Sequence, residues 1–267
     1  MPNCTITPHF ATNTVYVREA LVTDIPNLVE DTLEERGMLR IEEQKGRKEL
    51  SEAYRITREF GMDELVWNHI SLQLSDGSYL ITPGNRMFDD VSPQDLVKNG
   101  VNAEADVIHE AIYKARSDIK AVVHLRTPAT VAVSCLEMGF QPLAQEAAHF
   151  VGRVASLPFF DRGCCETAEQ LHIRDAVSDV KVNTLLMENN GFCTFGKSLG
   201  EAWMLAYYFD RACQTQLNCL QSGVKIRYPD PKALARSASL PLVGPAEGEW
   251  EALRKMLSRK GRARPTY

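Results

Sequence analysis

The sequence predicts an α/β protein whose sheet is at least partly antiparallel. Residues 105–116 carry apolar side chains at helical spacing, whereas residues 66–74 alternate between apolar and polar as a strand does. The pair Asp76-Gly77 separates that strand from a second at residues 78–82, which is a hairpin signal. Because strands joined by a tight hairpin run antiparallel, the sheet is not purely parallel.

Length and charge narrow the class of protein. With 267 residues, 44% of them hydrophobic, the chain can bury a sizeable core. A net charge of −5 argues against sequence-independent nucleic-acid binding, which depends on many Lys and Arg contacts. No apolar run reaches the roughly 20 residues that cross a bilayer, and the first residues lack a signal-peptide pattern. We therefore expect a cytoplasmic protein with a small-molecule partner, and no nucleic-acid or membrane partner.

Three parts are expected along the chain. Residues 1–44 form an N-terminal extension with a charged helix, and residues 45–225 form the main domain. Residues 226–267 are rich in proline, which predicts an extended tail that closes with a short helix at 249–257.

The later elements of the main domain follow from the same periodicities. A capping box of Ser198 and Glu201 opens a long helix, and Gly223 suits its C-terminal end. The other elements expected are a strand at 119–126, a helix at 128–138, a strand at 182–187 and, after a turn at 188–191, a strand at 192–195.

Three motifs resemble those of the class II aldolase/adducin family. They are WNHIS at 67–71, IHEAIYKARSD at 108–118 continuing to VVHLRTPAT at 122–130, and ENNG at 188–191 before the long helix. The resemblance implies a three-layer αβα sandwich around a mostly antiparallel sheet. It also implies a homo-oligomer, commonly a tetramer with active sites at subunit interfaces.

The metal site of the family's aldolases is altered in this sequence. In those enzymes three histidines hold a divalent ion, two from an H-x-H strand and one from an N-H-G turn. The matching positions here are His124, Arg126 and Asn190. Residues i and i+2 of a strand share a face, but a guanidinium has no lone pair for a metal. No cofactor is therefore expected, and a zinc or iron ion at His124 is the remaining alternative.

The same positions suggest chemistry without a metal. Arg126 would place a fixed charge at the old ion site and stabilise an enolate or carboxylate oxygen. His124 would move protons, and Asn190 and His109 complete the predicted catalytic group. The reaction expected is lyase-like: retro-aldol cleavage, decarboxylation, isomerisation or cyclisation in a biosynthetic or catabolic pathway. The residues predicted to bind the substrate are Asn68, His69, Ser71, Thr82, Gly84, Glu146 and His149.

Other interpretations remain open at this point. The chain could be a non-catalytic, adducin-like oligomeric binding module, or a metal-dependent enzyme with the rearranged ligands His109, His124 and His149. Arg126 could instead form a structural ion pair with Glu146 or Glu188.

Overall fold

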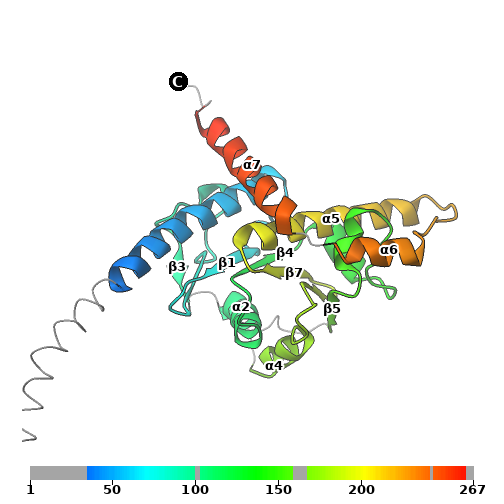
Figure 1. The fold of residues 1–267 in the computed structure, drawn as a ribbon, viewed down its shortest axis with the longest axis horizontal. Helices are drawn as coiled ribbons and strands as arrows, with labels where there is room; N and C mark the ends of the chain where they lie inside the picture. The colour runs from blue at the N-terminus through cyan, green and yellow to red at the C-terminus, as the bar shows by residue number, and fades with distance from the viewer. Residues whose placement is uncertain (1–34, 100–102, 159–166, 241–242, 263–267) are drawn as a thin grey trace, which may run out of the picture. The chain divides into compact units, whose positions relative to one another are not determined.

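The computed structural model describes residues 35–99, 103–158, 167–240 and 243–262 (Figure 1). The chain divides into two compact units, Met1–Gln44 and Lys45–Tyr267, and the features discussed below belong to the second. Most of the expected N-terminal extension, residues 1–34, lies outside the described residues. A helix covers residues 35–59, so its second half opens the second unit.

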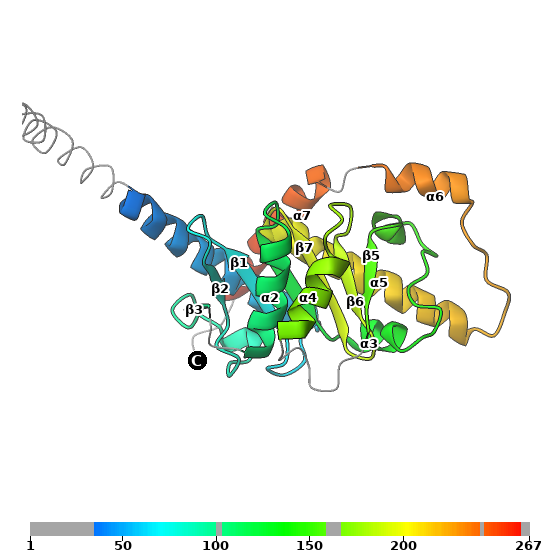
Figure 2. The same ribbon diagram turned by 90° about the horizontal axis from the view of Figure 1, so that it is seen from below.

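A seven-stranded sheet forms the middle of the second unit, in the order β3-β2-β1-β4-β7-β6-β5 (Figure 2). Only the β5–β6 pair is parallel, which confirms the mostly antiparallel sheet. The strands are β1 (His69–Gln73), β2 (Tyr79–Ile81), β3 (Val97–Lys98), β4 (Ala121–Leu125), β5 (Val154–Leu157), β6 (Thr184–Met187) and β7 (Gly191–Gly196).

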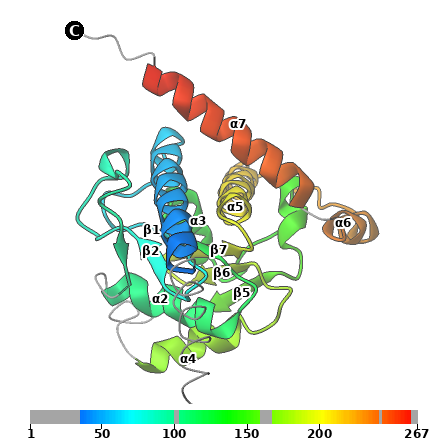
Figure 3. The ribbon, with the colours of Figure 1, turned by 60° about the vertical axis from the view of Figure 1, so that its left-hand side comes forward.

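Helices cover both faces of this sheet, which confirms the three-layer sandwich (Figure 3). One face lies under α2 (Ala103–Ala115) and α4 (Thr167–Ala176), and we call it the α2 face. The other lies under α5 (Leu199–Gln221), with residues 45–59 and α3 (Pro128–Ser134) beside it, and we call it the α5 face.

The alternation of side chains along β4 assigns residues to the two faces. Ala121, Val123 and Leu125 join the core of the α5 face, whereas Val122 joins the core of the α2 face. Successive strand residues point to opposite faces, so His124 lies on the α2 face with Val122.

The predicted start of the long helix is confirmed. The Ser198 hydroxyl accepts a hydrogen bond from the Glu201 backbone N–H at 3.1 Å. The Glu201 carboxylate in turn accepts from the Lys197 backbone N–H at 2.7 Å. These two bonds satisfy backbone donors that the first helical turn leaves without partners.

The C-terminal region is less extended than its prolines predict. It forms α6 (Pro231–Ala238) and α7 (Val243–Arg262), so the short helix expected at 249–257 is part of a longer one. Pro231 occupies the first turn of α6, where a missing backbone N–H costs nothing. Proline content alone is therefore a poor guide to this region.

A tryptophan attaches α7 to the α5 face. The Trp250 side chain is buried, and its indole N–H donates to the Glu49 carboxylate at 2.8 Å. Its ring lies so close to Gly200 that a Cβ atom there would approach ring atoms to within 2.8 Å. Across the described residues, no helix is both long enough and apolar enough to span a membrane.

Candidate active site

Three histidines from three elements meet on the α2 face. His69 begins β1, His124 lies in β4, and His109 comes from the middle of α2. The β1–β4 register pairs His69 directly with His124, and their rings stack with centroids 4.4 Å apart. The exposed fractions are 5% for His69, 3% for His124 and 0% for His109, so the group is buried.

His69 and His109 belong to a hydrogen-bonded network. His69 Nδ1 lies 2.6 Å from His109 Nε2, and His109 Nδ1 lies 2.5 Å from the Ser71 hydroxyl. The same hydroxyl is 2.7 Å from the phenol oxygen of Tyr113. Both nitrogens of His109 are therefore occupied within the network.

Other polar atoms nearby are buried without partners. Among the described residues, no hydrogen bond reaches either ring nitrogen of His124, Nδ2 of Asn68 or Oδ1 of Asn190. The opposite end of the Asn68 amide is fixed, because its Oδ1 accepts from the Glu64 backbone N–H at 2.7 Å. Most buried polar atoms in proteins are hydrogen-bonded, so these atoms mark a place for a ligand or ordered water.

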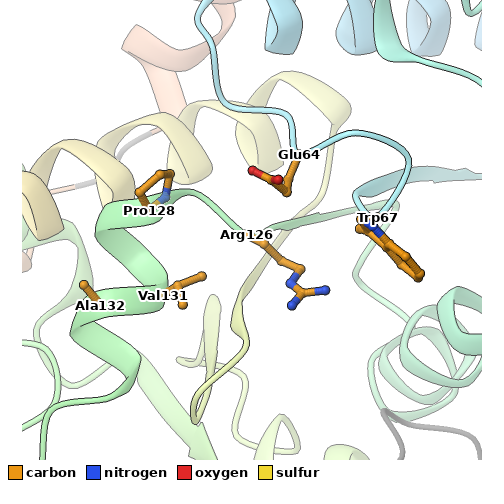
Figure 4. A pocket seen from close by; sticks show the side chains of 6 residues that line it. All are labelled: Glu64, Trp67, Arg126, Pro128, Val131 and Ala132. Carbon is orange, nitrogen blue, oxygen red and sulfur yellow. The ribbon is translucent and has the colours of Figure 1, made fainter.

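A pocket of about 670 Å³ includes Arg126, two residues after His124, and Trp67, two residues before His69, in its wall. Figure 4 shows the guanidinium between Trp67 and Val131. Trp67 is 53% exposed, which makes it a large aromatic surface open to solvent. The described residues provide Arg126 with no ion pair, so neither Glu146 nor Glu188 neutralises it. The remaining lining residues are Glu64, Pro128 and Ala132.

The Asn190 turn depends on the glycine that follows. A Cβ atom at Gly191 would lie 2.5 Å from the Leu125 carbonyl oxygen and 3.1 Å from the Arg126 side chain. Only glycine allows the turn to approach the end of β4 this closely. The turn thereby brings Asn190 near His124, where its amide oxygen would accept a hydrogen bond from a protonated imidazole and so acts to raise the pKa of His124, although no bond of normal geometry joins the two side chains in this structure.

Burial keeps all three histidines neutral at pH 7. It lowers the pKa of His124 to about 4, and the charge of Arg126 acts in the same direction. Burial likewise lowers the pKa values of His69 and His109 well below their ordinary value, with His124 as a further cause in both cases.

The donor set does not fit a divalent ion held in the family's manner. Arg126 and Asn190 replace two imidazoles, and zinc prefers nitrogen and sulfur ligands. Over the parts of the chain that the structure describes, no three His, Cys, Asp or Glu side chains are placed to hold a metal. The alternative set of His109, His124 and His149 is not brought together within one chain.

Two predicted binding residues lie elsewhere. Glu146 and His149 belong to a short 3-10 helix, η2 (Glu146–Phe150), which packs against α5. The His149 ring lies 5.6 Å from that of Tyr208, on the α5 face. Within one chain these side chains do not reach the His124 group.

The remaining predicted residues lie in or next to β1 and β2. Asn68 immediately precedes β1, Ser71 lies within it two residues after His69, and Thr82 follows β2. The Tyr54 hydroxyl joins these segments, because it donates to the Ile70 carbonyl at 2.5 Å and accepts from the Thr82 N–H at 3.2 Å. Thr82 in turn accepts from the Gly84 N–H at 3.4 Å.

Sequence reasoning missed Trp67, Glu64 and Tyr113. Tyr113 lies four residues after His109, a spacing that places both on one side of a helix. This spacing could have identified Tyr113 as a neighbour of His109. Trp67 is the first residue of the WNHIS motif and Glu64 precedes that motif, but both lie in a loop, and no periodicity marks loop residues as part of a site.

Comparison with known proteins identifies the family to which this fold belongs. The family model of the class II aldolase and adducin N-terminal domain matches residues 48–217. Alpha-adducin of Rattus norvegicus is 30% identical to this chain. The match covers 85% of this chain but only 35% of alpha-adducin.

Two solved structures show similar folds. An aldolase II superfamily protein from Pseudomonas syringae superposes with a TM-score of 0.77 at 25% identity, covering 82% of this chain and 94% of that one. An L-fuculose 1-phosphate aldolase from Glaciozyma antarctica PI12 gives a TM-score of 0.71 at 20% identity, covering 83% and 93%. The chain belongs to the class II aldolase and adducin N-terminal domain family.

Proposed function

We propose that the protein is a lyase that cleaves or rearranges a small carbonyl or carboxylate compound through an enolate, without the family's metal. One observation carries the proposal: buried polar atoms of His124, Asn68 and Asn190 lack partners among the described residues, and Arg126, two residues after His124, lines a pocket without an ion pair there. The oxygen of a substrate carbonyl or carboxylate would accept from Asn68 Nδ2 and from the Arg126 guanidinium, whereas a substrate hydroxyl would donate to Asn190 Oδ1 or to the unprotonated nitrogen of His124.

Arg126 would serve as the electrostatic element of the site. Its guanidinium stays charged at all working pH values and offers planar pairs of N–H donors. In a half-buried position, a fixed positive charge stabilises an oxyanion that develops during the reaction more than water does. A divalent ion that acts as a Lewis acid stabilises the developing oxyanion in the same way.

His124 would serve as the base. For a β-hydroxy carbonyl substrate, a neutral ring nitrogen removes the hydroxyl proton, the bond between the α and β carbons breaks, and an aldehyde forms. The electron pair of that bond moves to the carbonyl oxygen and gives an enolate, which Arg126 stabilises. The enolate carbon then takes up a proton, so atoms and charge balance. The low pKa of His124, about 4, keeps its lone pair free at neutral pH, and because it also makes the ring a weak base, the proton transfer depends on Arg126 stabilising the enolate as it forms.

The assembly is a separate part of the proposal. We propose a homo-oligomer, with a tetramer as the expected form, in which Glu146 and His149 reach a site only from another copy. The exposed face of Trp67 beside the pocket is the kind of aromatic surface that interfaces use. Light scattering coupled to gel filtration measures the mass, and a monomer would remove these two residues from the binding site.

A binding module is the second candidate function. The 30% identity to an alpha-adducin favours it, although the chain spans about a third of that protein's length. Under this alternative, Arg126 and Asn68 would hold an anionic ligand without turnover.

The decisive experiment is a turnover screen of β-hydroxy and β-keto carboxylates with the purified protein and its Arg126→Met variant. We expect one compound to be cleaved, with release of an aldehyde or carbon dioxide, and the variant to lose roughly 100- to 1000-fold in kcat/KM. Arg86→Met is the matched control, because within the described part of the chain the ion pairs of Arg86 are with the carboxylates Asp90 and Asp95 and lie outside this pocket.

Three results would contradict the proposal in different ways. Full activity of Arg126→Met would remove the guanidinium from the mechanism. Binding of the compounds without any turnover would favour the module. A divalent metal present in stoichiometric amount and lost in a His124→Gln variant would show that the chemistry depends on a metal.

A further inference from the structure

A continuous chain of hydrogen bonds crosses the interior of the α2 face. It runs from the Tyr113 hydroxyl to the Ser71 hydroxyl at 2.7 Å, to His109 Nδ1 at 2.5 Å, and from His109 Nε2 to His69 Nδ1 at 2.6 Å. All four side chains are buried. This series of hydrogen bonds joins α2 to β1 and ends at His69, whose ring stacks on that of His124.

Tyr113 and His69, the two ends of this hydrogen-bonded series, lie in different surroundings. Tyr113 lines a second pocket of about 290 Å³, together with Tyr79, Glu110 and Lys114. His69 lies in the group beside the Arg126 pocket, where no bond from the described residues occupies its Nε2 atom. The four side chains therefore bridge the protein from one pocket to the vicinity of the other.

The four hydrogen-bonded side chains permit two arrangements of their protons, and in both arrangements every side chain is neutral. In the first, Tyr113 donates to Ser71, Ser71 to His109, and His109 to His69, which leaves a proton on His69 Nε2. In the second, every donor becomes an acceptor and His69 Nε2 carries a lone pair. Each group can fill either role, because hydroxyls and neutral imidazoles both donate and accept.

We propose that Tyr113, Ser71, His109 and His69 form a proton relay that protonates the enolate carbon. Its use in catalysis rests on the proposed function, whereas its existence as a relay does not. His69 is then a catalytic residue that touches the intermediate. Ser71, His109 and Tyr113 are positioning residues that act through it.

The step balances as follows. His69 Nε2 gives its proton to the enolate carbon, and His69 Nδ1 takes one from His109. His109 takes one from Ser71, Ser71 takes one from Tyr113, and Tyr113 takes one from water in the second pocket, which leaves the negative charge of the enolate there as hydroxide. The relay resets in reverse: the proton that His124 removed from the substrate passes through pocket water to His69 Nε2, and Tyr113 returns one proton to the hydroxide.

Burial supplies the reason for a relay here. A buried imidazole resists holding a positive charge, and burial lowers the pKa values of both His69 and His109. A concerted shift along the chain moves a proton while leaving no net charge on either ring. The geometry thus overcomes the cost that a single buried histidine would face as a proton carrier.

The test is the tautomeric state of the histidines, measured by nitrogen-15 NMR on protein labelled at histidine. In the wild type we expect averaged signals for His69 and His109, because both arrangements are populated. In Tyr113→Phe, Ser71 keeps only His109 as a partner for its proton, so both rings should be fixed with the proton on Nε2. Tyr79→Phe is the matched control, since Tyr79 lines the same pocket but donates to Asp106 outside the relay.

Unchanged histidine signals in a folded Tyr113→Phe protein would overturn the relay. With a substrate from the turnover screen, we expect Tyr113→Phe to lower kcat roughly 100-fold at constant KM and to reduce the solvent deuterium isotope effect. Ser71→Thr, which keeps a hydroxyl, should restore what Ser71→Ala loses. If no compound is turned over, the proposed lyase function fails, whereas the NMR result still decides whether the relay exists.

Discussion

The two faces of the sheet differ in the kind of side chain that they bury and in whether its polar atoms are hydrogen-bonded. On the α5 face, large aromatic rings such as Trp203, Phe209 and Phe192 are fully buried, and Phe192 packs against Phe209. The polar atom of Trp203 is satisfied, because its indole N–H donates to the Thr57 hydroxyl at 2.9 Å. On the α2 face, the same sheet buries three histidines, and one of them has no hydrogen bond within the described residues.

The difference shows how one strand contributes to stability and to a candidate site at once. Odd-numbered residues of β4 are small or aliphatic and complete the α5 core, whereas His124 faces α2. Arg126 follows just past the end of the strand. Because the two roles occupy opposite faces, a change on one face should leave the other largely intact. Three predictions test that separation.

The largest expected effect is that of Trp203→Ala on the α5 face. The ring contacts Phe60 and Trp250, and its removal should lower the free energy of unfolding by about 3–5 kcal/mol. Urea denaturation followed by circular dichroism measures this loss. At temperatures where the variant is folded, the histidine NMR signals should match the wild type; altered tautomers would show that the two faces are coupled.

Acid should weaken the protein through the α2 face. The pKa of His124 falls from an ordinary 6.5 to about 4, so below pH 6.5 the unfolded chain binds a proton that the folded one does not. Stability is therefore complete above pH 6.5 and declines as the pH falls, by on the order of 3 kcal/mol from His124 alone at pH 4. His69 and His109 act with the same sign.

Urea denaturation at pH 6.5 and pH 5.0 measures this decline. His124→Gln should flatten the pH dependence, whereas His172→Gln, at an exposed position of α4, should leave it as in the wild type. Equal slopes in all three proteins would show that the buried histidine does not govern the acid response.

The smallest expected effect is that of Gly200→Ala where α7 meets α5. The new methyl group would clash with the Trp250 ring at 2.8 Å, and relieving the clash should cost about 1–3 kcal/mol. Gly248→Ala, in α7 with open space around it, should instead stabilise the protein by about 0.5–1 kcal/mol. Tryptophan fluorescence during urea denaturation measures both, and an unaffected Gly200→Ala protein would mean that α7 is not held there.

Much of the site was predictable because its residues lie in motifs with regular spacing. Arg126 comes two residues after His124 and just past the end of β4, and a short turn before β7 carries Asn190. Local rules also gave the start of α5, through Ser198 and Glu201. The positions of Glu146 and His149 were not predictable, because a 3-10 helix between distant elements follows no periodicity that reveals which face it covers.

The sequence by itself determined the family, the three-layer sandwich and the replacement of imidazoles by Arg126 and Asn190. The family and the two replacements depend on residue types at fixed positions in motifs, which a linear chain records, and the three-layer sandwich followed as what the family resemblance implies. Only the tertiary structure decided that His109 bonds to His69 and Ser71 while His124 remains without a partner. Those facts depend on how α2 lies across β1, and packing of distant segments in three dimensions sets that geometry.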